Sequence, residues 1–127
     1  MGPKAKVISD KVSDIWESEL NRIVTKLINR RDSDPFREPV PWKELQLLDY
    51  LNIVKIPMDL GTVKKKLDKK QYKSSDECAA DIRLIWHNSM SYNAPNSTFY
   101  NLAKSLSEIW EKEWSSSSGI SININNN

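Results

Sequence analysis

The 127-residue sequence is poor in the residues from which metal sites, disulfides and phosphate-binding loops are built. Its only cysteine, Cys78, excludes a disulfide within the chain and a cysteine-based zinc cluster. Its only histidine, His87, argues against a histidine-rich metal site and against a Ser-His-Asp triad. With three glycines in all, the chain has no phosphate-cradling glycine loop. We therefore expect a protein that is not an enzyme and that carries no metal or cofactor.

Long apolar runs and a strong excess of charge are also missing. No apolar stretch approaches the roughly 20 residues that a membrane-spanning helix needs, and the first residues lack the apolar core of a secretory signal. The net charge of +2 is small for a dedicated nucleic-acid-binding domain. Hydrophobic residues make up 39% of the chain, which is enough for the core of one domain. We expect a soluble, intracellular protein without membrane contact.

What the sequence does contain is helical periodicity. Apolar residues recur at helical spacing over residues 9–31, then in a helix that Asp59 caps and that runs through Leu67, then over 75–92 and 97–114. The stripe of the first helix consists of Val12, Ile15, Trp16, Leu20, Ile23, Val24, Leu27 and Ile28. Ser74 with Glu77 forms a capping box for the third helix, and Ser97 is the expected cap of the fourth. Cys78 lies on the apolar face of the third helix, and His87 on its flank.

Residues 32–58 connect the first two helices without a helical pattern of their own. Four prolines in this stretch, Pro35, Pro39, Pro41 and Pro57, forbid a continuous helix. The stretch is nevertheless rich in apolar residues, so it must pack against the body of the protein, with one short helical turn near 49–53. Ordered connections of this length are uncommon and often functional. This connection is the first sign of a preformed pocket.

The third helical pattern stops at Tyr92-Asn93-Ala94-Pro95. Asn93 tolerates the left-handed conformation in which helices often end, and Pro95 cannot extend a preceding helix. Asn93 therefore lies at a turn between two helices, with a side-chain amide that can both donate and accept hydrogen bonds. Its position alone fits either a helix cap or a ligand contact.

The two ends of the sequence differ from the helical part. We expect residues 1–8 to be a disordered leader, residues 9–114 to form the domain, and residues 115–127, which include a run of serines and asparagines, to be a flexible tail. This organisation is typical of a module taken from a longer protein.

The motifs in this order resemble a bromodomain, the module that binds acetylated lysine. The resemblance covers roughly residues 9–114 and is most specific in its central run. The matching residues are Asp34-Pro35-Phe36, Val40, Tyr50-Leu51-Asn52-Ile53-Val54-Lys55-Ile56-Pro57-Met58-Asp59-Leu60-Gly61-Thr62-Val63 and Tyr92-Asn93-Ala94-Pro95. It implies an all-α, left-handed four-helix bundle of helices Z, A, B and C. A long Z-to-A loop and a short B-to-C loop form the pocket in that fold.

The resemblance also implies a role for individual residues. Asn93 matches the asparagine that donates to the acetyl carbonyl, and Tyr50 matches the tyrosine that reaches the same oxygen through a water molecule. The remaining residues of the implied acetyl-lysine site are Val40, Leu45, Leu47, Tyr92, Phe99, Pro35 and Phe36. The alignment places no carboxylate in this pocket.

The chain departs from the family pattern at Asp34, where the family often has Trp before Pro-Phe. Asp34 and Trp42 are therefore expected at the rim, where Trp42 or Phe99 could replace the missing lid. Asp34 either points into water or favours a peptide with a neighbouring positive charge. It also leaves open an atypical bromodomain with weakened acetyl-lysine binding that serves as a protein- or DNA-contact module.

The resemblance implies a non-catalytic, nuclear reader of acetylated lysine in histone tails or other chromatin-associated proteins, acting as a monomer in transcription regulation. A basic run on the second predicted helix allows weak contact with nucleosomal DNA, although such a run is more often simply a solvated helix face. The run consists of Lys64, Lys65, Lys66, Lys69 and Lys70.

Overall fold

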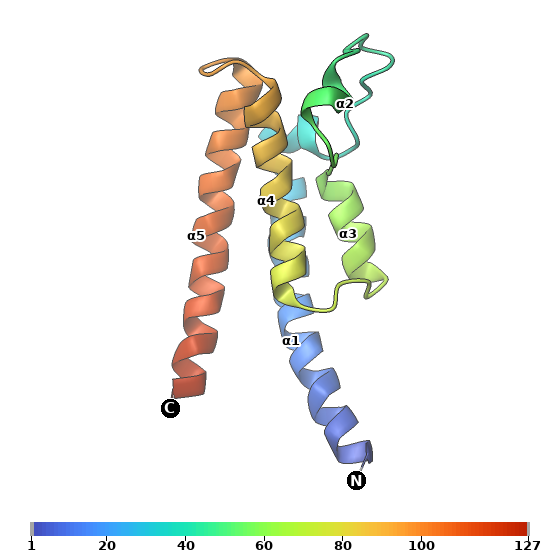
Figure 1. Cartoon of the computed structure of the whole chain (residues 1–127). Helices are drawn as coiled ribbons and strands as arrows, with labels where there is room; N and C mark the ends of the chain where they lie inside the picture. The colour runs from blue at the N-terminus through green and yellow to red at the C-terminus, as the bar shows by residue number, and fades with distance from the viewer. Residues whose placement is uncertain (1, 127) are drawn as a thin grey trace.

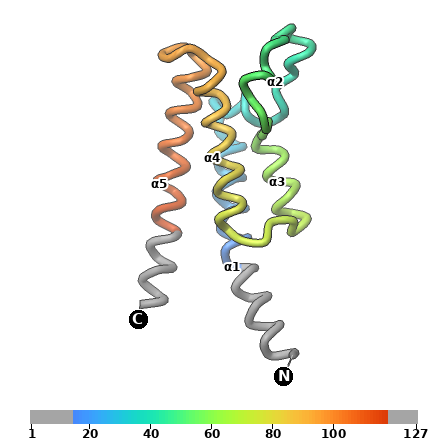
Figure 2. The backbone as a smooth tube through the Cα atoms, in the orientation of Figure 1, coloured from blue at the N-terminus to red at the C-terminus, as the bar shows by residue number. Residues whose placement is uncertain are grey.

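The computed structural model describes the backbone of residues 2–126 and the side chains of residues 15–117. Within this part, all regular structure is helical, as the sequence predicts. Four longer helices, α1 (Gly2–Ile28), α3 (Leu60–Asp68), α4 (Ser75–Tyr92) and α5 (Thr98–Asn126), run side by side in a bundle (Figure 1). The connection from α1 to α3 and the connection from α4 to α5 lie at the same end of the bundle, while the connection from α3 to α4 lies at the other (Figure 2).

The first helix ends three residues earlier than predicted, and a separate 3-10 helix, η1 (Arg31–Phe36), follows it. The break occurs at Arg30, whose backbone is extended (φ −75°, ψ 137°). The Ser33 hydroxyl donates to the carbonyls of Ile28 (3.1 Å) and Arg30 (2.8 Å), so acceptors at the end of α1 are satisfied without a further helical turn. The sequence periodicity missed this break because Arg30 and Arg31 are both good helix formers.

The long connection contains the short helix α2 (Tyr50–Ile53), which confirms the predicted helical turn. Asp59 caps α3 as predicted, since its side chain accepts from the Thr62 N–H (2.9 Å) and the Thr62 hydroxyl (2.7 Å). The Gly61 N–H donates to the Arg37 carbonyl at 3.0 Å. A Cβ atom on Gly61 would lie only 2.5 Å from that carbonyl oxygen. Only glycine allows this close approach, which joins the beginning of the long connection to the beginning of α3.

The predicted caps of α4 and α5 are also present. The Ser74 hydroxyl accepts from the Glu77 N–H (3.3 Å), but the Glu77 carboxylate accepts from the Lys73 N–H (2.8 Å) rather than from Ser74. The Ser97 hydroxyl accepts from the Tyr100 N–H at 3.4 Å. The turn between α4 and α5 has its left-handed residue at Asn96 (φ 68°), while Asn93 is extended (φ −94°, ψ 147°).

The core lies between the four long helices. Its fully buried members include Leu20, Leu27, Ile82, Trp86, Leu106 and Trp110. Ile15 was predicted to belong to the buried stripe of α1, but its side chain is 66% exposed. Ile15 immediately precedes Trp16, which packs against the core. Because consecutive residues of a helix point about 100° apart, Ile15 points away from the core. The described side chains do not include Val12 or the predicted leader, residues 1–8, and they include only the first residues of the predicted tail, residues 115–127. The predicted domain limits therefore stay a prediction.

A polar cluster joins α3 to α4 next to the core. One oxygen of the Asp81 carboxylate accepts from the Tyr72 hydroxyl (2.6 Å) and from the Lys66 ammonium (2.9 Å). The ammonium also lies over the Tyr72 ring, 4.5 Å from its centre. Cys78 lies fully buried one turn before Asp81 on α4, in the core role predicted for it. Burial raises the pKa of the Cys78 thiol to about 12 and also raises the pKa of the Tyr72 phenol.

These two groups predict how stability depends on pH. Because their pKa values are higher in the folded state, the unfolded chain loses its protons first as the pH rises. The contribution of Cys78 is complete below the ordinary thiol value of 9.0 and is lost as the pH approaches 12, whereas that of Tyr72 begins to fall only near the ordinary phenol value of 10.0. We expect the free energy of unfolding, measured by urea denaturation, to fall by on the order of 1 kcal/mol from pH 8 to pH 10. In the same samples a thiol reagent should modify Cys78 only after unfolding; modification of the native protein at pH 8 would contradict the buried thiol.

Gly61 provides a second test. Alanine normally stabilises a helix relative to glycine by up to about 1 kcal/mol, but here its methyl group would push the Arg37 carbonyl away. We expect Gly61→Ala to lower the melting temperature by roughly 5–10 °C, since overpacking costs about 1–3 kcal/mol. Lys65→Ala, an exposed change on the same helix, is the matched control and should leave the melting temperature nearly unchanged. An unchanged or higher melting temperature for Gly61→Ala would show that the close approach is not needed.

Candidate functional site

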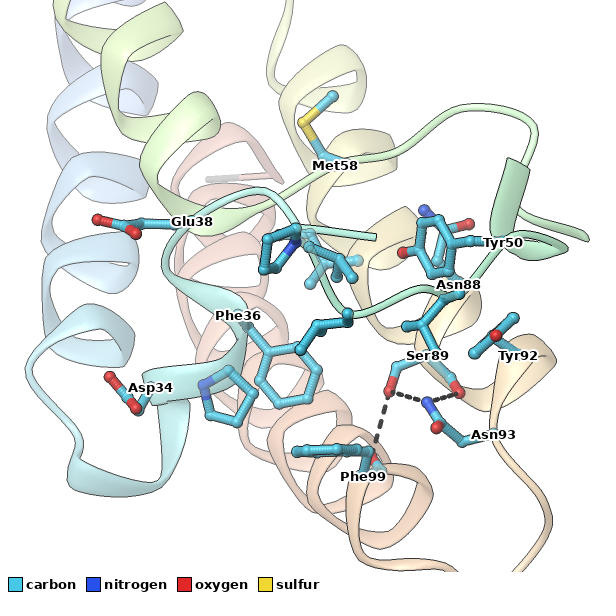
Figure 3. Close-up of a pocket in the computed structure, with 16 residues that line it drawn as sticks. Asp34, Phe36, Glu38, Tyr50, Met58, Asn88, Ser89, Tyr92, Asn93 and Phe99 are labelled. Carbon is cyan, nitrogen blue, oxygen red and sulfur yellow. Dashed lines mark hydrogen bonds between the residues drawn. The ribbon is translucent and has the colours of Figure 1, made fainter. Parts of the chain in front are cut away.

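A cavity of about 630 Å³ opens between the long connection and the end of α4. It lies at the end of the bundle that carries both the α1-to-α3 and the α4-to-α5 connections (Figure 1). Its lining is predominantly apolar, with a few polar side chains (Figure 3). The lining residues come from η1, the long connection, α4, the turn after α4 and the first turn of α5. They are Asp34, Pro35, Phe36, Glu38, Val40, Pro41, Leu45, Leu47, Tyr50, Met58, Ile85, Asn88, Ser89, Tyr92, Asn93 and Phe99.

Asn93 presents its side-chain amide to this cavity from the C-cap position of α4. The amide nitrogen donates to the Ser89 carbonyl at 2.9 Å and, over a longer distance of 3.3 Å, to the Ser89 hydroxyl (Figure 3). The carbonyl contact is the short one, and it fixes the orientation of the amide. At 3.3 Å, the contact with the Ser89 hydroxyl is a weak hydrogen bond. The N–H that makes this contact is therefore the one that can donate to the carbonyl of a ligand instead.

Two tyrosines stand beside Asn93. Tyr50, at the start of α2, is 6% exposed, and burial raises the pKa of its phenol. The phenol therefore stays protonated at neutral pH and can act as a hydrogen-bond donor. The Tyr92 ring packs edge-on against the Tyr50 ring, with centres 5.0 Å apart and planes at 64°. The Tyr92 hydroxyl donates to the Asp49 carboxylate at 2.7 Å.

Asn88 ties the long connection to α4 deeper in the cavity. Its side chain is 7% exposed, and its amide nitrogen donates to the Ile56 carbonyl at 2.9 Å. A second link joins α4 to α5, because the Ser89 hydroxyl donates to the Phe99 carbonyl at 3.2 Å. The two walls of the cavity are therefore fixed to α4 by hydrogen bonds from successive residues of one helix.

The cavity brings together all nine residues that the sequence assigns to the acetyl-lysine site, and it also includes Asp34. Phe36 is buried and packs edge-on against Trp86, with ring centres 5.5 Å apart, so it forms the inner wall. Phe99 is 49% exposed and stands at the opening. Trp42, predicted at the rim, is not among the lining residues; the Lys43 ammonium lies over its ring at 5.5 Å. Of the two candidates for replacing the missing lid, only Phe99 borders the cavity.

Two carboxylates border the cavity: Asp34, which the sequence places at the rim, and Glu38, which corrects the expectation that the pocket has no carboxylate. Figure 3 shows, however, that both carboxylates lie on the side of the cavity away from Asn93. The Asp34 carboxylate is 81% exposed and forms an ion pair with Arg37 at 3.3 Å. The acidic groups are therefore at the edge, and the interior beside Asn93 is lined by apolar and neutral polar groups.

Sequence reasoning missed several lining residues. Met58 and Ile85 complete the apolar wall, while Asn88 and Ser89 supply the polar contacts described above. Helical spacing in the sequence could have identified some of these lining residues. Ile85, Ser89 and Tyr92 precede Asn93 on one face of α4, at steps of three or four residues that bring side chains together. The bond from Asn88 to Ile56 spans 32 residues and has no local signature.

Comparison with known proteins agrees with this geometry. The family model described as Bromodomain matches residues 20–105. The chain belongs to the bromodomain family. Bromodomains are acetyl-lysine reader modules of chromatin and transcription proteins, and in their terms α1, α3, α4 and α5 of this bromodomain are helices Z, A, B and C.

Several curated relatives come from Arabidopsis thaliana. "Transcription factor GTE10" is 39% identical over 98 residues, which are 77% of this chain and 9% of that protein. "Transcription factor GTE3, chloroplastic" is 44% identical over 94 residues, 74% of this chain and 20% of that protein. "Transcription factor GTE1" is 45% identical over 80 residues, 63% of this chain and 21% of that protein. The bromodomain thus corresponds to about a tenth to a fifth of each of these relatives.

Neither a metal-binding cluster nor a membrane-spanning helix occurs among the residues that the structure describes. No cluster of three or more His, Cys, Asp or Glu side chains in this part of the bromodomain is placed to hold a metal ion. None of the helices in this part of the chain combines the length and the apolar character needed to cross a membrane.

Asn88 gives a test of how the site is built. Asn88→Ala removes the side-chain amide that donates to the Ile56 carbonyl, and the loss of one such hydrogen bond costs roughly 0.5–1.5 kcal/mol. We expect a lower melting temperature and faster amide hydrogen exchange in residues 49–58, with little change in exchange within α1. Ser91→Ala, an exposed change one turn further along α4, is the control. Unchanged exchange in residues 49–58 of Asn88→Ala would mean that other contacts hold this loop.

Proposed function

We propose that this bromodomain reads acetylated lysine in histone tails or other chromatin-associated proteins, through Asn93, a water molecule held by Tyr50 and the apolar walls of the cavity. The observation that carries the proposal is the neutral Asn93 amide, oriented by the Ser89 carbonyl, at the side of a predominantly apolar cavity. Its more weakly held N–H is available to the acetyl carbonyl. A water that bridges from the Tyr50 hydroxyl adds a contact nearly as favourable as a direct hydrogen bond.

This arrangement distinguishes acetyl-lysine from lysine by the cost of desolvation. An ammonium that enters an apolar cavity loses its hydration and finds no counter-ion beside Asn93, which is costly. A neutral amide costs far less to bury once its oxygen has found a donor. The carboxylates of Asp34 and Glu38 do not remove this penalty, since they lie at the outer edge (Figure 3).

The expected affinity is modest. One direct hydrogen bond contributes on the order of 1 kcal/mol, and each buried methylene or methyl group about 0.8 kcal/mol, before association costs of several kcal/mol. Single acetyl-lysine peptides should therefore bind with Kd values in roughly the micromolar to millimolar range. Reading several acetyl groups together would strengthen binding without new contacts.

An atypical bromodomain with weakened binding is the alternative that Asp34 raises. Two observations favour the reader. The Asp34 carboxylate pairs with Arg37 and is largely solvated, so it does not occupy the cavity. Phe99 and Leu45 still supply apolar surface at the opening, being 49% and 57% exposed. The missing Trp removes part of a lid, and we expect that change to lower affinity rather than to abolish binding.

Contact with nucleosomal DNA receives less support. Of the five lysines on and after α3, Lys64 pairs with Asp68 (2.8 Å), Lys66 with Asp81 (2.9 Å) and Lys70 with Glu17 (3.2 Å). Each pair offsets a positive charge that would otherwise face a phosphate. We also propose that this bromodomain acts as a monomer in the nucleus, within a transcription protein. The family and the words "Transcription factor" in the names of the relatives support the part in transcription, whereas the name of GTE3 carries the word "chloroplastic".

Replacement of Asn93 tests the proposal directly. We expect Asn93→Ala to abolish calorimetric binding of an acetylated histone-tail peptide, because the cavity then offers no N–H to the acetyl carbonyl. The melting temperature should change by only a few degrees, because the variant loses the side-chain hydrogen bonds to Ser89 but keeps the backbone bond that caps α4. Asn101→Ala is the matched control, since the exposed side chain of Asn101 donates to the Asn96 carbonyl (3.3 Å) and does not line the cavity.

Tyr50→Phe should weaken binding less than Asn93→Ala, because the water network can partly re-form. Equal binding by the wild-type protein and Asn93→Ala, or equal binding of acetylated and unmodified peptides, would refute the proposed function.

A further inference from the structure

The Asp49 carboxylate does not make the contact that its position suggests. Asp49 is the N-cap residue of α2, and aspartate at an N-cap normally accepts a hydrogen bond from the first turn of the helix. Here the side chain makes no cap hydrogen bond. Its carboxylate instead accepts from the Tyr92 hydroxyl, 43 residues further along the chain, at 2.7 Å. This distance is typical of a hydroxyl that donates to an ionised carboxylate.

The bond joins the two parts of the cavity that carry its polar groups. Asp49 immediately precedes Tyr50, and Tyr92 immediately precedes Asn93. The Tyr92 ring also packs edge-on against the Tyr50 ring at 5.0 Å. Two consecutive residues of the long connection therefore hold one residue at the end of α4. Figure 3 shows Tyr92 between Tyr50 and Asn93.

Asp49 itself is exposed and does not line the cavity. Whatever it contributes to binding must therefore act through Tyr92 and Tyr50, which do line it. The hydrogen bond with Asp49 is also the main reason why the pKa of the Tyr92 phenol lies above its ordinary value. The hydroxyl consequently keeps the proton that it donates.

We infer that Asp49 is a positioning residue of the acetyl-lysine site, which holds α2 against the end of α4 and so fixes the Tyr50 hydroxyl relative to the Asn93 amide. This inference rests on the proposed function. Without the bond, α2 can move away from α4, and the direct contact from Asn93 and the water-mediated contact from Tyr50 no longer converge on one oxygen. Affinity then falls, although no group that touches the ligand has changed.

The test is a double-mutant cycle on the binding of an acetylated histone-tail peptide, measured by calorimetry. We expect Asp49→Ala and Tyr92→Phe each to weaken binding by about fivefold, the change that corresponds to about 1 kcal/mol. The double variant should bind no more weakly than either single variant, because both changes break the same bond. Asp49→Asn keeps an acceptor oxygen and should stay within about twofold of wild type. Glu44→Ala, an exposed acid on the same connection that does not line the cavity, is the matched control.

A second readout on the ligand-free protein separates positioning from general destabilisation. With ¹³C-labelled tyrosine, NMR follows the titration of Tyr92 by itself. In Asp49→Ala the Tyr92 phenol should titrate at a lower pH than in wild type, while the NMR signals of Tyr72, which bonds to Asp81, stay in place. The melting temperature of Asp49→Ala should change little, since the bond is exposed to solvent.

The outcomes distinguish this inference from the proposed function. If the wild-type protein does not bind the acetylated peptide, both are overturned. If wild type binds and Asp49→Ala binds equally well, or if the effects of Asp49→Ala and Tyr92→Phe multiply in the double variant, the inference alone is overturned. An unchanged titration of Tyr92 in Asp49→Ala would also overturn it, because the two side chains would then not be bonded in solution.

Discussion

The cavity exists because a long apolar connection is tied to its neighbours at fixed points and does not collapse onto the core. Apolar side chains in residues 37–59 would gain free energy by packing against α4. The bond from Gly61 to the Arg37 carbonyl holds the start of this connection, and the bond from Asn88 to the Ile56 carbonyl holds its end. Between these points the long connection passes over α4 and leaves a cavity of about 630 Å³, which is lined by residues of the connection and of α4.

Within this hollow, Asn93 combines two requirements that usually conflict. A polar group in an apolar site must be satisfied in the absence of ligand, yet it must be free to bind when ligand arrives. The Asn93 amide meets the first through its short bond to the Ser89 carbonyl. Under the proposed function it also meets the second, because its longer contact with the Ser89 hydroxyl is weak and little is lost when a ligand oxygen replaces it. The Ser89 hydroxyl keeps an acceptor of its own, the Phe99 carbonyl, in either case.

Features of the fold that depend on neighbouring residues could be predicted from the sequence. The caps at Asp59 and Ser97 and the helical turn at α2 involve contacts within four residues, and the periodic stripes define the long helices. The resemblance to bromodomains added Asn93 and the tyrosines. What could not be predicted depends on contacts between distant segments. The role of Asn88, the presence of Glu38 at the edge of the cavity, and the placement of Trp42 away from it are set by how the long connection folds over α4.

The central proposal is that the neutral side-chain amide of Asn93, in a predominantly apolar cavity, recognises acetylated lysine. The most direct measurement is an NMR titration that follows the side-chain amide protons of Asn93. With an acetyl-lysine peptide, the proton that faces the Ser89 hydroxyl should move strongly downfield, while the proton bonded to the Ser89 carbonyl moves little. An unmodified peptide should shift neither. A response to both peptides alike, or binding of the acetylated peptide that leaves both protons in place, would contradict the account.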